Sequence, residues 1–424
     1  MKIVEGIFVT SRSKERAQLK FNEDTGLIED YGQLGEPADY IYDDDCLIFA
    51  GMGDVHIHAR EDVSTKQNYK EDFLTASKAA INGGVTHFCD MPNNPVPPID
   101  DDSYQNKLVL THKGLVPILL YAGIGPGTTP LSKLVPYKAY MGPSVGQLFF
   151  KDDLELEETI KNYEGEHVSF HCEDPVVLDS HKQESTHLAR RPLEAELLAT
   201  DTALRLIEKY NLKGKLCHYS AGDGLPKIMA AKAGGVDVVS EVTPQHLYYC
   251  DENLPQERRT YFQMNPPIRS RADQEAMLKA FIDGDIDFLA TDHAPHTLEE
   301  KEMGTSGLTG LDTYGAFVTW AIVEKGMDPK LISLTCSENP GHFVNKFLPT
   351  IKTIDPFFEK FGKGFGKLEE GYFANLTILN LKKATTIKAC DLQTKVGHSP
   401  FEGVKFPGRV EAVFVGGIPH CKKK

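Results

Sequence analysis

Residues 51–60 read GMGDVHIHAR, and they place His56, His58 and Arg60 at alternate positions directly behind an apolar run. If residues 46–55 (CLIFAGMGDV) form one buried strand, alternate side chains share a face, so both imidazoles and the guanidinium project from its carboxyl end to the same side. Imidazole is a common zinc ligand. An isolated pair of this kind is more often two histidines in a turn, so the rest of the chain has to decide.

Size and charge narrow the classes of function. A chain of 424 residues exceeds the usual size of one domain, which predicts a large domain with a smaller one attached. The net charge of −15, from 61 acidic and 46 basic residues, argues against a nucleic-acid or membrane partner, since both favour basic patches. We therefore expect a small-molecule substrate, and an anionic one would need a local cation such as Arg60.

The sequence also suggests a compartment. It opens without a basic and then apolar signal peptide, and no apolar run approaches the roughly 20 residues that span a bilayer. The eight cysteines include no CxxC pair, so neither a zinc ribbon nor a disulfide framework is predicted. We expect a cytoplasmic protein with reduced cysteines, among which Cys172 and Cys217 adjoin histidines but point away from them into packing.

The order of apolar runs predicts the fold class. Residues 1–45 read as short strands, and eight strand-like runs follow at 47–55, 85–91, 116–123, 137–141, 167–172, 215–219, 236–242 and 286–291. Helical spacing lies between most of them, for example at 69–82, 152–163, 192–210 and 271–283. Eight alternating units predict an α/β protein with a TIM (β/α)8 barrel over residues 49–345. A helical stretch at 331–349 and strands in the tail follow, and residues 1–48 with 346–424 are predicted to form a small β-sandwich from both termini.

Function on a barrel of this kind belongs at the carboxyl ends of the strands. Ligand-type side chains stand where most of these runs end, and they would meet on one rim: His56, His58 and Arg60, then Asn93, Lys138, His171, His218, and finally Asp292 and His296. Taken singly, His171 or His218 is more often a satisfied core histidine. Taken together, four histidines, an aspartate and a lysine indicate a metal site.

These residues carry a family resemblance over nearly the whole chain. The stretches are DVHIHARED (54–62), NGGVTHFCDMPNNP (82–95), KAYMGPSVG (138–146), HCED (171–174), EVTPQHL (241–247), MNPPIR (264–269), ATDHAPH (290–296) and GLTGLDT (307–313). Their order resembles the amidohydrolase superfamily, in the cyclic-amide branch that contains dihydroorotases, hydantoinases and allantoinases, and it is most similar to the dihydroorotase family. HSPFEG (398–403) is also recurrent in the tail of this branch, but no chemistry follows from it.

The resemblance implies a binuclear zinc site. One Zn²⁺ would be held by His56, His58 and Asp292, a second by His171 and His218, and a carboxylated Lys138 would bridge them. The physical logic agrees, because an unmodified ammonium would stand beside two cations, whereas a carbamate offers each metal an oxygen. Some relatives use an aspartate near this position, so Asp152 and Asp153 remain alternatives for the bridge. His187, His246, Gln245 and His293 are given packing roles.

The implied reaction is the reversible hydrolysis of dihydroorotate to N-carbamoyl-L-aspartate in pyrimidine synthesis. Asp292 would be the catalytic base, and the substrate would be held by Arg60, Asn93, Asn265 and His296. Hydantoinase, dihydropyrimidinase and allantoinase activities are the competing enzymatic readings, and a substrate without a ring carboxylate would leave Arg60 without a role. A third alternative is a non-catalytic assembly partner, in which some of the metal-ligand residues would be replaced. We also expect a homo-oligomer, either a dimer or a tetramer.

Overall fold

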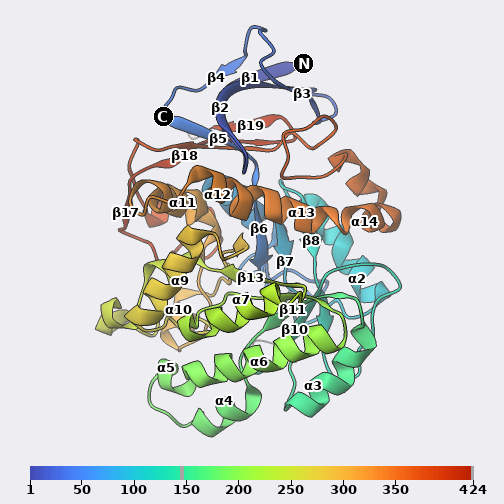
Figure 1. Cartoon of the computed structure of the whole chain (residues 1–424), viewed down its shortest axis with the longest axis vertical. Helices are drawn as coiled ribbons and strands as arrows, with labels where there is room; N and C mark the ends of the chain where they lie inside the picture. The colour runs from blue at the N-terminus through green and yellow to red at the C-terminus, as the bar shows by residue number, and fades with distance from the viewer. Residues whose placement is uncertain (144–147, 422–424) are drawn as a thin grey trace.

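A barrel of parallel strands occupies the lower part of the molecule in Figure 1, a computed structural model that describes residues 1–143 and 148–421. Two parallel sheets make the barrel wall, one with the order β6-β7-β8 and one with the order β14-β13-β12-β11-β10-β9. The strands are β6 (Met52–Ile57), β7 (Val85–Asp90), β8 (Ile118–Leu120), β9 (Ala122–Ile124), β10 (Tyr137–Tyr140), β11 (His167–His171), β12 (Lys213–Leu216), β13 (Val238–Val242) and β14 (Phe288–Leu289).

The two sheets join into one ring. Only Tyr121 separates β8 from β9, so these two pieces continue one barrel strand. On the other side, a parallel bridge between Ile57 and His293 links the end of β6 to the chain after β14. The predicted TIM barrel is confirmed, and its strand ends face the same rim.

Helices surround the barrel, and their ends follow local capping chemistry. The predicted helix at 271–283 forms with those bounds, because the Ser270 side chain accepts from the Asp273 amide. The helix predicted from residue 69 starts later, because Asp72 caps it through the Thr75 amide. The helices are α1 (Phe73–Gly83), α2 (Asp101–Leu108), α3 (Asp153–Ile160), α4 (Pro175–His181), α5 (His187–Arg190), α6 (Leu193–Lys209), α7 (Leu225–Ala233), α8 (Pro244–Tyr248), α9 (Arg271–Asp283), α10 (Leu298–Glu302), α11 (Tyr314–Val323), α12 (Pro329–Ser333), α13 (Asn339–Asn345) and α14 (Leu348–Ile354).

Both ends of the chain build a second, β-rich part, at the top of Figure 1. One sheet has the order β19-β18-β15-β5-β1-β2-β3, with β4 paired to β1. Its strands are β1 (Lys2–Val9), β2 (Lys14–Phe21), β3 (Ile28–Gly32), β4 (Tyr40–Ile41), β5 (Cys46–Ala50), β15 (Leu376–Asn380), β18 (Arg409–Val415) and β19 (Ile418–Cys421). β5 pairs with β1 on one side and with β15 on the other, so the two termini are hydrogen-bonded into one unit with its own apolar core.

The expectation of one strand over residues 46–55 is wrong in a specific way. The run is two strands in two sheets: β5 belongs to the terminal sheet and β6 to the barrel. They meet at Gly51, where φ is +23° and an added Cβ would lie 2.5 Å from both the Asn375 Cβ and the Thr86 Oγ1. Only a glycine fits this crossing without moving its neighbours.

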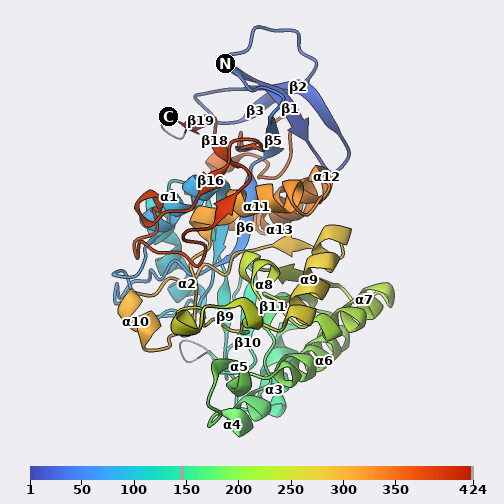
Figure 2. The same cartoon turned by 90° about the vertical axis from the view of Figure 1, so that its left-hand side faces the viewer.

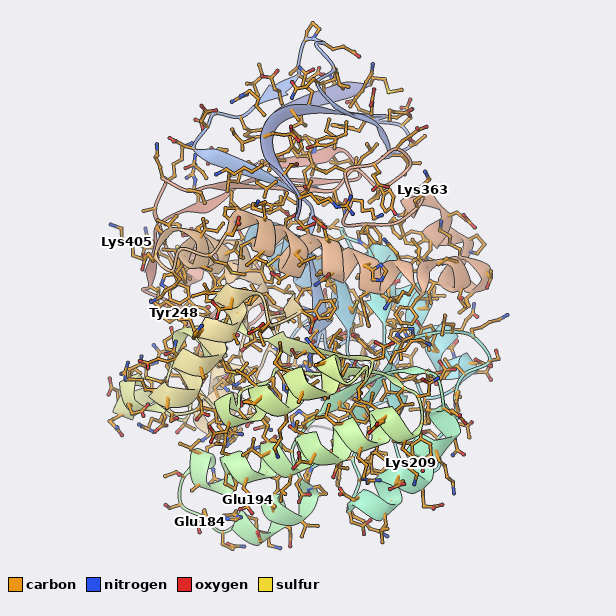
Figure 3. All side chains as sticks on the ribbon, in the orientation of Figure 1. Glu184, Glu194, Lys209, Tyr248, Lys363 and Lys405 are labelled. Carbon is orange, nitrogen blue, oxygen red and sulfur yellow. The ribbon has the colours of Figure 1, made fainter. Side chains whose placement is uncertain are left out.

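Side chains fill the space between the strands and the helices (Figure 3). None of the helices in the described ranges is long and apolar enough to cross a membrane. Within the KAYMGPSVG stretch, residues 144–146 lie outside the described residues, while Lys138 is in β10.

Candidate active site

The predicted ligand residues meet at the carboxyl ends of the barrel strands. A cavity of about 40 Å³ is lined there by His56, His58, Arg60, Asn93, Tyr140, His171, His218, Asn265, Asp292, Ala294, Ser306 and Gly307. His56 lies in β6 and His171 ends β11, while His218 and Asp292 follow β12 and β14 in left-handed conformations, with φ of 38° and 47°. Such conformations are strained for residues with a Cβ, and they occur most often at functional sites.

Three of these residues form one compact group. The Nε2 atoms of His56 and His58 lie 3.3 and 3.0 Å from the same Asp292 oxygen. Ligand atoms of the three side chains lie within 4.8 Å of one another, and all three side chains are buried. This donor set of two imidazoles and a carboxylate is one that zinc accepts.

A second pair of imidazoles lies beside this group. Nδ1 of His171 is 2.9 Å from Nε2 of His218, and the His56 and His218 rings are 5.1 Å apart between centroids. The other nitrogen of His171 faces a Glu173 oxygen at 2.7 Å, so it carries the proton and Nδ1 keeps the lone pair. Nδ1 of His218 is buried without a hydrogen-bond partner. With the His171 proton on Nε2, its Nδ1 accepts from Nε2 of His218, which leaves the lone pair of His218 on its unpartnered Nδ1.

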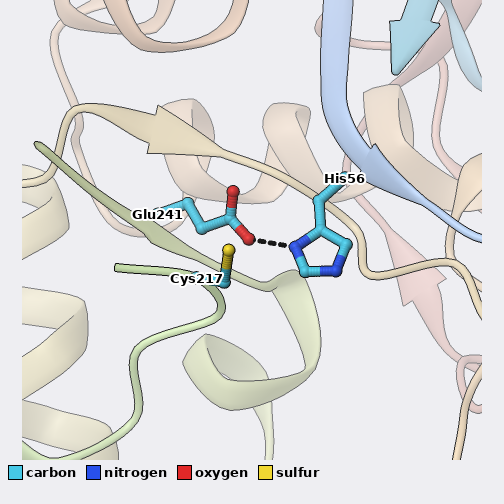
Figure 4. A group of neighbouring side chains, drawn as sticks. All are labelled: His56, Cys217 and Glu241. Atoms are coloured by element: carbon cyan, nitrogen blue, oxygen red, sulfur yellow. Dashed lines mark hydrogen bonds and ion pairs between the residues drawn. The ribbon is translucent and has the colours of Figure 1, made fainter. Parts of the chain in front are cut away.

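Buried acceptors fix the orientation of the other two rings. A Glu241 oxygen, at the end of β13, bonds Nδ1 of His56, as the dashed line in Figure 4 shows. The amide oxygen of Asn93 accepts from Nδ1 of His58 at 2.6 Å. In both rings Nε2 is left to face Asp292, which is the arrangement in which a carboxylate or amide orients a metal-binding histidine.

Burial keeps the four imidazoles neutral. It lowers the pKa of His56 to about 4 and lowers the pKa values of His58, His171 and His218 as well. Burial alone would raise the pKa of Glu241, but the Lys215 ammonium and His56 outweigh it, and the pKa is lowered. Neutral rings and an ionised orienting carboxylate are the states that metal binding requires.

Cys217 differs from its expected placement. Figure 4 shows it beside His56 and Glu241, and its sulfur is within 4.8 Å of their ligand atoms, although alternation predicted that it would point away. Burial raises the pKa of its thiol to about 11, and the Glu241 carboxylate is engaged by Lys215. The thiol is therefore protonated. Cys217 packs against the metal-type cluster, by which we mean His56, His58, His171, His218 and Asp292, and does not form a separate site.

The Lys138 amine is one of several buried groups here without a hydrogen-bond partner, together with Nδ1 of His218, the Tyr140 hydroxyl and Oδ1 of Asn265. Its Nζ is buried without a hydrogen bond and lies 5.2 Å from the Tyr140 ring centroid. The charge of Lys138 helps to lower the pKa of His218, after burial and His171, which places the amine beside the imidazoles. A buried amine without a partner fits a group that is modified or that meets an ion.

The aspartates considered as alternatives to Lys138 lie elsewhere. Asp152 caps α3 by accepting from the Glu155 amide at 2.9 Å. Asp153 accepts from the Thr202 hydroxyl at 2.7 Å. Neither aspartate lines the cavity; Lys138 does not line it either, but its charge acts on His56, His171 and His218.

Arg60 lies at the other side of the cavity, but not for the predicted reason. β6 ends at Ile57, and Arg60 has φ of 63°, so strand alternation does not aim its side chain. Its guanidinium donates to the Pro295 carbonyl at 3.3 Å and to Nε2 of His296 at 3.1 Å. Nδ1 of His296 lies 3.1 Å from the Lys70 Nζ and 3.3 Å from a Glu300 oxygen, so this ring lies between two cations and a carboxylate.

Asn265 lies on the Arg60 side of the cavity and has an unused hydrogen-bond acceptor. It lines the cavity, and its Oδ1 is buried without a partner. The carbonyls of its two neighbours are each held by a histidine: Nε2 of His187 bonds Met264 O at 2.9 Å, and Nε2 of His246 bonds Pro266 O at 3.1 Å. The histidines outside the ligand set therefore fix backbone rather than metal.

Sequence reasoning did not find the orienting carboxylates. Glu173 and Glu241 carry no spacing signal, and only their positions at the ends of β11 and β13 could have suggested them. Tyr140 and Ser306 also line the cavity without having been singled out.

Comparisons with known proteins decide the family. No protein-family model matches the chain. A dihydroorotase from Halalkalibacterium halodurans is 32% identical over 401 residues, covering 88% of this chain and 86% of its own length. One from Listeria innocua is 34% identical over 403 residues, with the same coverage, and one from Shouchella clausii is 30% identical over 447 residues, covering 100% of this chain and 98% of its own. The chain belongs to the dihydroorotase family.

Solved structures agree on the fold. An L-hydantoinase (dihydropyrimidinase) from Arthrobacter aurescens superposes with a TM-score of 0.84 at 23% identity, covering 99% of this chain and 96% of that one. A D-hydantoinase gives 0.81 at 22% identity, covering 99% and 94%. At this identity the likeness shows the barrel with its β-rich module, while the dihydroorotase family assignment rests on the sequence relatives.

Proposed function

We propose that the protein hydrolyses the cyclic amide of dihydroorotate, reversibly, to N-carbamoyl-L-aspartate, in the cavity at the barrel rim. The dihydroorotase relatives support the reaction. The observation that carries the substrate choice is the buried guanidinium of Arg60 beside a metal-type cluster in a protein of net charge −15. A buried cation without a carboxylate partner suits a substrate that brings one.

The metal ligands we propose follow from the donor set. His56, His58 and Asp292 would hold one ion, His171 and His218 a second, and Lys138 as a carbamate would lie between them. The unpartnered Lys138 Nζ and His218 Nδ1 support this assignment. Two divalent ions, zinc by the family resemblance, would lower the pKa of water and polarise the ring carbonyl when bound.

The remaining residues act on protons and on the substrate carboxylate. Asp292 lies at the junction of the cluster and the cavity, so its free oxygen can take the proton of the attacking water and return it to the ring nitrogen. Arg60, Asn93, Asn265 and His296 would bind the substrate around its carboxylate. The Asn93 oxygen accepts from His58, which leaves its NH₂ group to donate to an anion.

The test is a comparison of ring substrates with and without a carboxylate. We expect wild type to prefer dihydroorotate to dihydrouracil and allantoin, and Arg60→Met to lose kcat/KM on dihydroorotate by about 100-fold or more, since a charged hydrogen bond contributes about 1.5–3 kcal/mol and two are available. Arg12→Met, at an exposed arginine, is the matched control. Faster turnover of dihydrouracil or allantoin by wild type, or unchanged kinetics in Arg60→Met, would refute the substrate assignment.

We also propose a homo-oligomer, dimer or tetramer, in the cytoplasm, with domains at 1–48 plus 346–424 and at 49–345. The cysteines whose side chains are described are all free, which suits a reducing compartment. Light scattering on the purified chain would test the oligomer, with a monomeric mass as the contrary result.

A further inference from the structure

HSPFEG, the tail motif to which the sequence gave no chemistry, lies against the barrel rim. The chain leaves the terminal sheet after β15, forms a two-stranded ribbon of β16 (Thr385–Thr386) and β17 (Lys405–Phe406), and between these strands lies against the barrel beside α1 (Figure 2). Within this tail segment, residues 387–404, His398 is 5% exposed and Phe401 is fully buried among Tyr248, Tyr249 and Phe317. The packing anchors the segment and leaves the His398 ring facing the cavity wall.

Each polar atom of the His398 ring has one partner. Its Nε2 donates to the carbonyl of His296 at 2.8 Å, and its Nδ1 accepts from the Tyr261 hydroxyl at 2.8 Å. The His398 carbonyl in turn accepts from the Thr309 hydroxyl at 2.7 Å. Since a carbonyl only accepts and a neutral ring has one N–H, the His296 carbonyl fixes the proton on Nε2, and the Tyr261 hydroxyl donates to the remaining lone pair on Nδ1.

Two of the three partners of His398, His296 and Thr309, belong to the carboxylate side of the cavity. The His296 ring accepts from Arg60, so its backbone position sets where the guanidinium lies. Thr309 is two residues from Gly307, which lines the cavity so closely that a Cβ there would lie 2.9 Å from the His296 ring. Within the described part of the chain, His398 makes its hydrogen bonds with His296, Tyr261 and Thr309, and none with the four histidines or the aspartate of the metal-type cluster.

The same tail segment also supports the part of the cavity wall formed by residues 307–311. The Thr394 hydroxyl and the Lys395 amide donate to Glu71, which also faces Nε2 of His293 at 3.3 Å. Nδ1 of His293 accepts from the amides of Gly310 and Leu311 at 3.1 and 3.4 Å. Residues 394–398 therefore fix the 307–311 wall at two points, and His398 is the point nearest to Arg60.

We propose that His398 is a positioning residue for the substrate carboxylate: it fixes the His296 backbone, and through the His296 ring it fixes the Arg60 guanidinium. This rests on the proposed role of Arg60 and His296 in binding the carboxylate. Because His398 acts on that side only, its loss affects substrate binding and leaves the metal-type cluster in place.

The variants separate positioning from general packing. In His398→Gln the side-chain amide can still donate to the His296 carbonyl, whereas His398→Ala removes the donor. Tyr261→Phe keeps the ring and removes only the hydroxyl that donates to Nδ1 of His398. His342→Ala, at an exposed histidine of α13 on the far end of the barrel, is the matched control.

The readouts are KM and kcat for dihydroorotate, together with metal content. We expect His398→Ala to raise KM about tenfold with kcat within about threefold and metal content unchanged, a split that marks lost substrate binding. His398→Gln should recover most of the KM, Tyr261→Phe should show a smaller rise, and His342→Ala should match wild type.

Two results overturn the inference, and a third is distinguishable from both. An unchanged KM in His398→Ala, while His296→Ala and Arg60→Met raise it, shows that His398 does not position them. A joint loss of kcat, KM and metal that His398→Gln does not repair shows a structural role only. If His296→Ala and Arg60→Met also leave KM unchanged, the proposed carboxylate site itself has failed.

Discussion

Three of the four histidines in the cavity have one ring nitrogen held by a neighbouring oxygen, and the other nitrogen faces the shared space. Glu241 holds His56, Asn93 holds His58 and Glu173 holds His171. Glu241 and Asn93 come from other parts of the chain than the rings they hold, whereas Glu173 lies two residues after His171, so tertiary structure fixes two of the rings and the chain just beyond β11 fixes the third. At this scale the site is pre-organised before any ion binds.

Lys138 gives the first prediction. Because its amine is buried without a partner, we expect a carbamate there to bridge two ions, and Lys138→Ala should lose metal and activity together. Adding a short carboxylic acid should restore part of both. Elemental analysis checks the metal, with wild type expected to hold two ions per chain after supplementation. Full activity in the alanine variant, or at most one ion in wild type, would count against the bridge.

Asp292 gives the second prediction. Asp292→Asn keeps an oxygen toward His56 and His58 but cannot take a proton, so kcat should fall by about 10²–10⁴-fold while at least one metal stays bound. Turnover and metal content measured on the same preparation check this. Retained turnover would remove Asp292 as the base.

The residue positions were predictable from the sequence to different degrees. His56, Lys138 and His171 stand on or at the end of apolar runs, so barrel topology alone brings them to one rim. Arg60 reaches the cavity through a left-handed turn that alternation cannot foresee. The orienting role of Glu241 depends on a contact between β13 and β6, which a single sequence does not contain, whereas the contact of Glu173 with His171 is local, two residues along the chain.

At the scale of elements, the apolar run before His56 serves two sheets. β5 lies between β1 and β15 in the terminal sheet, and one residue later β6 starts the barrel. Every residue from Cys46 to Ile57 is buried, so hydrophobicity shows no break. The break is visible only as Gly51, and a lone glycine in a strand pattern is ambiguous.

Gly51→Ala tests this junction. The new Cβ would meet Asn375 and Thr86 at 2.5 Å, and the positive φ adds strain, so we expect a loss of about 2–3 kcal/mol in the free energy of unfolding. Gly35→Ala is the control, because Gly35 has φ of +69° with open space around it and should lose only about 1 kcal/mol. Urea unfolding measures both, and equal losses would mean that the crossing is not tightly packed.

At the scale of the whole molecule, neutral histidines are buried well away from the cavity. His87 is stacked on Phe365 at 4.8 Å in an apolar crevice under the barrel, and its Nε2 has no partner. Burial lowers the pKa of His87 to about 3 and that of His167 to about 3. A proton on the His87 ring would have to be carried into an apolar space, whereas His167 lies in a pocket beside Lys213 and Lys346, whose charges also oppose a proton there.

This predicts a stability that falls with acidity. The folded pKa of His87 is below its unfolded value near 6.5, so its contribution is complete above pH 6.5 and is lost as pH falls toward 3. Between pH 7 and pH 5 this residue alone should cost about 2 kcal/mol. His87→Phe, which keeps a ring against Phe365, should unfold with a shallower pH dependence in urea titrations at the two pH values. An unchanged slope would show that His87 takes up its proton as readily in the folded protein as in the unfolded chain.

The pairing of the two chain ends also has a consequence for synthesis. A ribosome adds about 5–20 residues per second, and it makes His56 through Asp292 before it reaches β15 and His398. The growing chain therefore holds every ligand-type side chain of the cluster while β5 still lacks its β15 neighbour and the His296 carbonyl still lacks its donor. Metal can be captured during translation, whereas the wall around the carboxylate is finished only afterwards.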